Sequence, residues 1–201
     1  MKAAYTKPFF TAFIIILADQ AIKTWVRKYM YMGEEIRFLG SHGMLHYTEN
    51  NGMAFGMEWG GDAGKLALTL FRIAAVVGIV YSLIYLIKHK YHRGLVMNVA
   101  LILAGAVGNI IDSTFYGILF QHGKLFHGRV VDMFYFPLLR GTYPTWFPFW
   151  GGEAFEFFRP VFNLADSAIC VGVIMILLYQ KRYFKHEIPE VASPNSEMVE
   201  E

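Results

Sequence analysis

Four apolar stretches, each long enough to cross a bilayer as a helix, constrain this chain more than any other feature. They cover about residues 9–26, 66–87, 95–112 and 162–180. A spanning helix needs roughly 20 mostly apolar residues, because its backbone polar groups must be satisfied within the segment. Only 17% of the 201 residues are charged, and 55% are hydrophobic. We therefore expect a membrane all-α fold with four transmembrane helices.

The first apolar stretch also has the length of a signal peptide. Against cleavage, no small-x-small site follows the apolar run, and polar residues interrupt its end. Two of these, Asp19 and Lys23, lie one helical turn apart, so they can pair and share the cost of desolvation. We expect this pair to support the fold, because a paired lysine keeps the carboxylate ionised and unsuited to proton transfer.

The connection between the first two spans, about residues 27–62, has the pattern of a small β element on the membrane surface. Two short segments, 36–39 and 44–48, flank a turn with the sequence Ser-His-Gly. The loop 50–56 follows. Its asparagines and glycines tolerate left-handed backbone, and this composition suits either a binding loop or an ordinary turn.

A second connection, about residues 134–160, is crowded with Phe, Trp, Tyr, Pro and Gly. This composition is typical of an aromatic belt at the membrane surface. The membrane domain is thus expected to cover residues 1–184. The remaining segment, 185–201, contains prolines and glutamates and few apolar residues, so we expect a disordered tail.

Basic residues orient the chain. They flank alternate ends of the spans, at Lys2, Lys7, Lys88, Lys90, Arg93, Lys181, Arg182 and Lys185. Cytoplasmic loops carry an excess of Lys and Arg, so both termini and the loop 88–94 should be cytoplasmic. The polar residues of interest then gather at or near the outer surface: Asp19, Asn50, Asn109, Asp112, Asp132, Asn163 and Asp166.

Two carboxylates stand out in this group, Asp132 in the stretch 128–134 and Asp166 in the stretch 162–168. An ionisable residue at a membrane boundary is costly unless it is paired, hydrated or used. Either aspartate alone could merely cap a helix or face the headgroups. Together they provide what an aspartic hydrolase needs, one carboxylate to draw a proton from water and one carboxyl to donate a proton.

The main alternative is a small transporter or channel subunit with an aspartate-based proton relay. A relay would favour carboxylates spread across the membrane depth, whereas these cluster at one face. A purely structural scaffold would leave the paired Asn and Asp motifs unexplained. The single cysteine, Cys170, excludes an internal disulfide, and no Cys/His cluster has metal-ligand spacing. We expect no metal or other cofactor.

Five motifs, in chain order, resemble those of the bacterial lipoprotein signal peptidases (signal peptidase II). They are Asp19-Gln20-x-x-Lys23, Asn50-x-Gly52-x-Ala54-Phe55-Gly56, Gly108-Asn109-x-x-Asp112, Val130-Val131-Asp132 and Phe162-Asn163-Leu164-Ala165-Asp166-Ser167. The resemblance implies a membrane-embedded aspartic endopeptidase of the bacterial inner membrane. Its substrates would be prolipoproteins whose lipobox cysteine carries diacylglycerol, cut just before that cysteine.

Carried over position by position, the resemblance makes Asp132 and Asp166 the catalytic dyad. The residues implied to shape the pocket and contact the substrate are Asn50, Gly52, Asn109, Asp112 and Asn163. One carboxyl of such a dyad is protonated and the other ionised, since like charges this close cannot both ionise cheaply. The resemblance further implies contact with membrane lipids and inhibition by globomycin-like cyclic peptides, and no nucleic-acid partner.

The chain departs from the family pattern in two places. The family usually has an arginine directly after the aspartate of the Gly-Asn-x-x-Asp motif, where this chain has Ser113. Arg129, three residues before Asp132, could replace it in contacting the substrate, or could simply reach the headgroups. Arg72, near one end of the second span, is interpreted as a headgroup contact. The spacing of 34 positions from Asp132 to Asp166 also exceeds the usual one, because of the aromatic-rich insertion.

Overall fold

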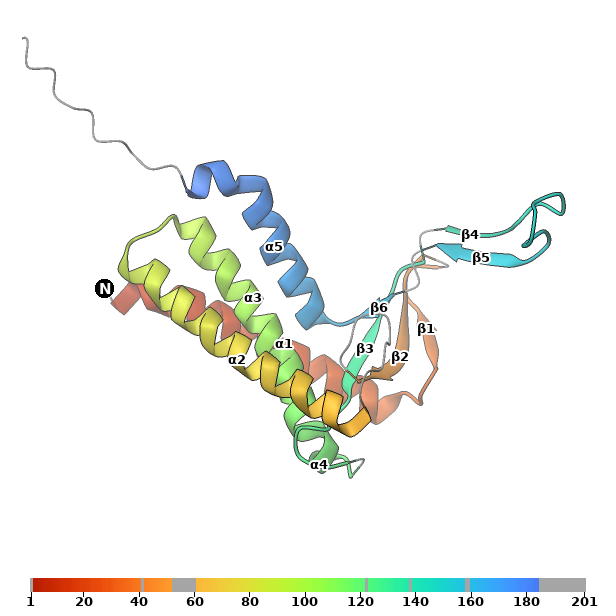
Figure 1. Cartoon of the computed structure of the whole chain (residues 1–201), viewed down its shortest axis with the longest axis horizontal. Helices are drawn as coiled ribbons and strands as arrows, with labels where there is room; N and C mark the ends of the chain where they lie inside the picture. The colour runs from red at the N-terminus through yellow and green to blue at the C-terminus, as the bar shows by residue number, and fades with distance from the viewer. Residues whose placement is uncertain are drawn as a thin grey trace, which may run out of the picture.

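The computed structural model describes residues 2–40, 42–51, 61–121, 123–137, 139–157 and 160–184. Four long helices dominate the fold (Figure 1): α1 (Lys2–Tyr29), α2 (Gly61–Lys88), α3 (Arg93–Ile111) and α5 (Leu164–Tyr183). All four are long and apolar enough to cross a membrane, with α3 continued by the next two elements to Leu119. The four predicted spans are confirmed, and α1 and α2 extend beyond the apolar runs at both ends.

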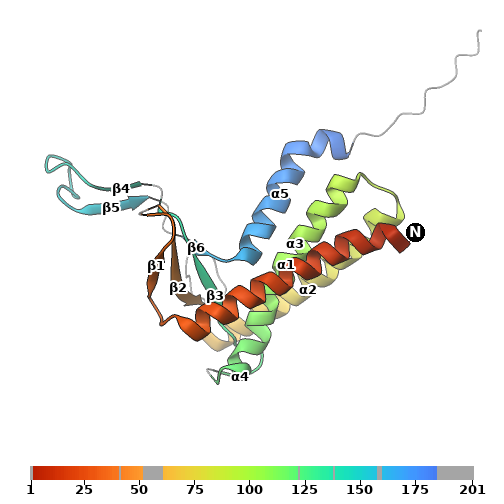
Figure 2. The same cartoon turned by 180° about the vertical axis from the view of Figure 1, so that it is seen from behind.

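Helix α3 lies at the centre of the bundle and packs against the other three long helices (Figures 1 and 2). Its small residues permit this close approach. A Cβ atom on Gly105 would lie 2.1 Å from the carbonyl oxygen of Ala165, so α3 and α5 could not pack as they do with any other residue there. Away from the sheet, Leu83 and Ile87 of α2 pack on Val96, Ala100 and Leu103 of α3 in an apolar cluster.

After Ile111 the helix widens into a π-helical turn, η2 (Asp112–Tyr116), followed by the short α4 (Gly117–Leu119). Single π turns inside helices occur frequently at functional sites. Gly128 packs directly on this turn, since a Cβ atom there would lie 1.9 Å from the Asp112 carbonyl oxygen. The backbone N–H of Gly128 donates to the Ser113 carbonyl at 2.9 Å, which fixes where the next strand begins.

An antiparallel sheet covers one end of the bundle, here termed the sheet end. Its strand order is β1 (Glu35–Arg37), β2 (Met44–Asn50), β3 (Val130–Tyr135) and β6 (Val161–Phe162). The sequence predicted β1 and β2. It did not predict that strands from two later segments complete the sheet, with Thr48 opposite Asp132 and Phe134 opposite Phe162.

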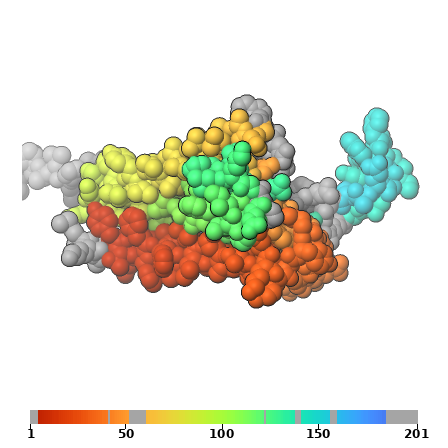
Figure 3. All heavy atoms as spheres, turned by 90° about the horizontal axis from the view of Figure 1, so that it is seen from below, coloured from red at the N-terminus to blue at the C-terminus, as the bar shows by residue number. Residues whose placement is uncertain are grey.

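Part of the aromatic-rich segment 134–160 forms a hairpin of β4 (Leu139–Thr142) and β5 (Ala154–Phe157). The hairpin projects from the sheet, away from the helices, and Figure 3 shows it standing apart from the rest of the molecule. The predicted disordered tail, 185–201, and most of the predicted loop 50–56 lie outside the described residues.

Candidate active site

Asp132 lies in the middle of β3, between β2 and β6, and only 2% of its surface is exposed. Its carboxylate accepts hydrogen bonds from two asparagine side chains. Asn163 donates through Nδ2 to Oδ1 at 2.7 Å, and Asn50, at the end of β2, donates to Oδ2. Burial raises the pKa of Asp132 to about 7, and the negative charge of Asp166 acts in the same direction.

Asp166 lies in the first turn of α5, where it forms a capping box with Asn163. The Asn163 side-chain oxygen accepts from the Asp166 N–H at 2.9 Å, and Asp166 Oδ2 accepts from the Asn163 N–H at 3.2 Å. A capping box satisfies two N–H groups that the helix itself leaves free. Because Asn163 Nδ2 also donates to Asp132, this one buried residue binds both aspartates directly.

Asn109, at the sheet end of α3, adds a second connection. Its Nδ2 donates to Asp166 Oδ1 at 2.8 Å, so Asp166 is held by α3 as well as by its own helix cap. Its Oδ1 accepts from Asn163 Nδ2 at 3.2 Å and from Lys23 Nζ at 3.1 Å. Because the amide nitrogen donates one bond and the amide oxygen accepts two, the orientation of the amide is fixed.

Beneath the two aspartates lies a buried ion cluster. Lys23 Nζ is 2.9 Å from Asp19 Oδ2 and 2.7 Å from Asp112 Oδ2, and all three side chains are at most 1% exposed. Gln20 Nε2 donates to Asp112 at 2.9 Å, and Asp19 accepts the N–H of Ala165 at 2.9 Å. Buried charges persist only when paired and hydrogen-bonded in this way.

The predicted Asp19–Lys23 pair is therefore present, with Asp112 as its third member. Asp112 was expected to contact substrate. Its full burial and its bonds to Lys23 and Gln20 favour a supporting role, because no face of this carboxylate is open. Through Lys23, the cluster also holds the oxygen of Asn109 and so the orientation of the bond to Asp166.

The guanidinium that reaches this site comes from α2. Arg72 donates from one of its terminal nitrogens to Ser113 Oγ at 3.1 Å, and that hydroxyl donates to the Asn109 carbonyl at 2.9 Å. Arg72 also lies within electrostatic range of both Asp132 and Asp166. Its interpretation as a headgroup contact missed this. The available signal was the single arginine in an apolar span, beside a motif that has Ser113 in place of the family's arginine.

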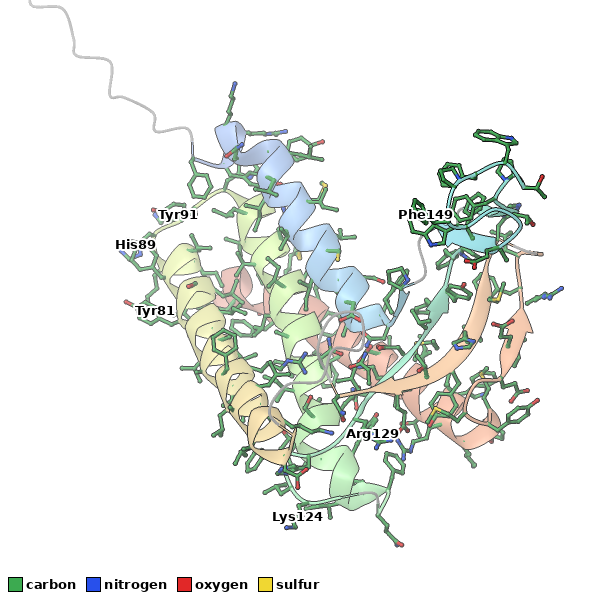
Figure 4. All side chains as sticks on the ribbon, turned by 45° about the vertical axis from the view of Figure 1, so that its right-hand side comes forward. Tyr81, His89, Tyr91, Lys124, Arg129 and Phe149 are labelled. Atoms are coloured by element: carbon green, nitrogen blue, oxygen red, sulfur yellow. The ribbon has the colours of Figure 1, made fainter. Side chains whose placement is uncertain are left out.

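Arg129, for which the sequence left open a substrate contact or a headgroup contact, is exposed and makes no hydrogen bond or ion pair within the described part of the chain. Figure 4 shows it on the connection that leads into β3. Gly52 lies outside the described residues, so its predicted part in the pocket stays a prediction. Within the described ranges, no three His, Cys, Asp or Glu side chains are grouped to hold a metal ion.

Comparison with known proteins gives matches along most of the chain. The family described as "Signal peptidase (SPase) II" matches residues 11–182. A lipoprotein signal peptidase of Porphyromonas gingivalis is 43% identical, and the match covers 92% of this chain and 89% of that protein. One from Amoebophilus asiaticus is 38% identical over 94% of this chain and 85% of that protein.

Two solved structures share the fold. Both are described as bacterial membrane enzymes whose structures were obtained by the in meso method, and both are 22% identical in sequence to this chain. One has a TM-score of 0.63 and covers 91% of this chain and 93% of its own. The other has a TM-score of 0.60 and covers 88% and 93%.

Proposed function

The chain belongs to the signal peptidase II family, and on that premise we propose that Asp132 and Asp166 form its catalytic dyad. The protein is an aspartic-type lipoprotein signal peptidase, a multi-pass membrane protease that removes signal peptides from prolipoproteins. The observation that carries the dyad assignment is the bonding of both carboxyl groups to the single residue Asn163. Two carboxyl groups held on one rigid residue can share a proton across a water molecule.

The two aspartates differ in a way that suggests their roles. Asp132 is buried and its pKa is raised to about 7, so it is suited to hold the shared proton at neutral pH. Asp166 is only partly buried, and it accepts hydrogen bonds from the Asn163 N–H and from Asn109. It is therefore the better candidate for the ionised carboxylate that can reach water.

In the proposed mechanism Asp166 takes a proton from a water molecule while the water oxygen attacks the carbonyl carbon of the scissile peptide bond. Asp132 hydrogen-bonds the developing oxyanion through its proton. Collapse of the tetrahedral intermediate breaks the C–N bond, and the proton that Asp166 took from water passes to the leaving amine. The dyad needs no group beyond two carboxyl groups in opposite protonation states, which the environment of Asp132 favours.

The substrate is proposed to carry a diacylglyceryl group on the cysteine that follows the scissile bond. Asp132 and Asp166 lie where the sheet meets the first turn of α5, at the end of a membrane-spanning helix. A lipid-modified cysteine would present its peptide bond at that depth, with its acyl chains among the lipids. Globomycin-like cyclic peptides are expected to bind in the same place.

We assign the cation beside the dyad to Arg72. A guanidinium offers several N–H groups in a fixed plane, a geometry that suits the ester or peptide carbonyl oxygens of a lipidated substrate, and the bond to Ser113 holds that of Arg72 at the site. The exposed Arg129 is left as the alternative. The basic loops and ends favour an orientation in the bacterial inner membrane with both termini cytoplasmic and the dyad near the outer face.

Cleavage of a purified precursor tests this function. The protein in bilayer discs is incubated with one prolipoprotein in two forms, with and without the diacylglyceryl group, and the products are identified by mass spectrometry. We expect a single new N-terminus at the lipidated cysteine and little product from the unmodified form. Equal cleavage of both forms would contradict the proposal that the enzyme requires the lipid. Cleavage at another bond would contradict the proposed cut site.

A further inference from the structure

The end of the β4–β5 hairpin is an apolar surface that the proposed mechanism does not use. Residues 143–152 contain no charged side chain and include five aromatic ones. Two backbone hydrogen bonds close this end, from the Tyr143 N–H to the Glu153 carbonyl and from the Gly152 N–H to the Tyr143 carbonyl, each 2.9 Å. The hairpin end is thus a folded unit with its own hydrogen bonds.

Tyr143 is the centre of a small aromatic cluster within this unit. Its ring centroid lies 5.0 Å from that of Phe155, 5.1 Å from that of Phe147 and 6.2 Å from that of Trp150. Aromatic rings attract each other at these separations. The cluster therefore holds the shape of the hairpin end and determines which side chains point outward.

Three large aromatic side chains of the hairpin end are exposed. Phe149 is 92% exposed, Trp146 78% and Trp150 53%. Phe149 also has a φ of 73°, a left-handed conformation that is a genuine outlier for a bulky residue. Figure 4 shows Phe149 at the hairpin. Contiguous exposed aromatic surface of this kind marks an interaction site.

We propose that this surface binds the bilayer, with Trp146, Phe149 and Trp150 inserted at the level of the lipid headgroups. Four membrane-spanning helices fix a bilayer beside the sheet, and the hairpin leaves the sheet sideways from the bundle (Figures 1 and 2). Tryptophan and tyrosine rings favour the membrane–water interface, where one part of the ring is apolar and the other polar. Because residues 143–152 carry no charged side chain, inserting them requires no charge to be desolvated.

Such an anchor would be coupled to the catalytic strand. In the chain, the hairpin lies between β3, which carries Asp132, and β6, which leads to Asn163. At its base Phe136 stacks on Phe162, with ring centroids 5.9 Å apart, directly before the helix cap. Holding the hairpin end at the headgroups therefore holds the sheet and the dyad at a fixed height relative to a lipid-embedded substrate.

The depth of Trp146 measures this insertion. The chain has four tryptophans, so replacing Trp25, Trp59 and Trp150 by Phe leaves Trp146 as the only one. The full-length protein is placed in bilayer discs whose lipids carry a nitroxide quencher, either at the headgroup or deep in the acyl chain, with one protein per disc. We expect strong quenching from the headgroup position, weaker quenching from the deep one, and protection from aqueous acrylamide.

Acrylamide quenching without nitroxide quenching would overturn the proposal, because the side chain would then face water. Protection from all three quenchers would overturn it as well, because the ring would then be covered by protein. Neither result depends on peptidase activity, so the measurement stands apart from the proposed function.

Activity gives a second readout. Trp146→Ser, Phe149→Asn and Trp150→Ser together remove the aromatic surface, and asparagine suits the left-handed position. We expect cleavage of a bilayer-embedded precursor to fall several-fold and cleavage in detergent micelles to stay unchanged. A control with Trp146→Phe, Phe149→Tyr and Trp150→Tyr keeps the surface aromatic and should retain the bilayer rate. Equal bilayer rates for all three proteins would contradict the anchor.

Discussion

The two ends of α3 are buried by opposite kinds of chemistry. Toward the α2–α3 connection, Val96, Ala100 and Leu103 pack on aliphatic side chains of α2. At the sheet end, Asn109 and Asp112 are also buried, and their neighbours are charged or polar side chains from α1 and α5. One helix thus has a half that packs on apolar side chains of α2, here termed the apolar half, and a polar half of similar burial.

The difference shows which half the chemistry requires. In a bilayer, apolar packing holds helices together without special partners, whereas each buried polar group needs a hydrogen bond. The polar half brings together Lys23, Asp19 and Asp112 from two helices, an arrangement that packing alone does not need. We infer that the apolar half stabilises the bundle and that the polar half orients the dyad.

Lys23→Met should give the largest loss of stability among these variants. It leaves Asp19 and Asp112 buried without their cation, and breaking a buried ion pair costs about 3–5 kcal/mol. Cleavage should fall with it, because Asn109 loses the donor that fixes its amide. Unfolding in mixed detergent micelles measures the stability. Lys7→Met, an exposed lysine of the same helix, is the control and should stay within about 0.5 kcal/mol of wild type.

Leu83→Ala tests the apolar half, and we expect it to lower stability without lowering cleavage. Leu83 is fully buried in the apolar cluster, and truncating such a side chain costs about 2–4 kcal/mol. Cleavage per folded molecule should remain at the wild-type level, because no contact of the dyad changes. Loss of activity in folded Leu83→Ala protein would show that the two halves of α3 are not separate in function.

Arg72→Ala sharpens the polar half. If its guanidinium orients the substrate, kcat/KM should fall by an amount equal to about 1.5–3 kcal/mol, the scale of hydrogen bonds to charged groups. Arg72→Lys should recover part of the loss, since an ammonium lacks the planar fork. Arg129→Ala is the matched comparison, and we expect a smaller loss there. The reverse order would return the substrate contact to Arg129.

The pH dependence should show the smallest effect. With the pKa of Asp132 at about 7, deprotonation between pH 7 and pH 8 should lower kcat/KM about fivefold, which equals about 1 kcal/mol. The folded pKa lies above the ordinary value of 3.8, so the folded state binds more protons between the two. Stability should therefore fall as pH rises from about 4 to 7. Flat profiles of both rate and unfolding midpoint would contradict the raised pKa.

Much of this site could be predicted from short spacings along the chain. Asn163 and Asp166 are three residues apart, the spacing of a capping box, and Asp19 and Lys23 are one helical turn apart. The alternative interpretation of Asp166 as a helix cap is confirmed, although capping is not its only role. The cap uses Asp166 Oδ2, while Oδ1 accepts from Asn109, so one carboxylate does both.

The long-range parts could not be predicted, because local pattern carries no information on them. Asp132 pairs with Thr48 across 84 residues of chain, and the sheet depends on that register. The reach of Arg72 to Ser113 depends on how α2 packs on α3. The aromatic-rich segment 134–160 gave no indication of the strands β4 and β5, because Pro and Gly residues are rare in the interior of strands.

The most direct test replaces each aspartate of the dyad in turn. Asp132→Asn and Asp166→Asn keep the size of the side chain and remove its ability to accept or donate the transferred proton. Cleavage of the prolipoprotein that carries diacylglyceryl on its cysteine is measured for each protein, together with its unfolding midpoint. We predict that both folded variants lose all measurable cleavage. Substantial turnover by either one would contradict the dyad.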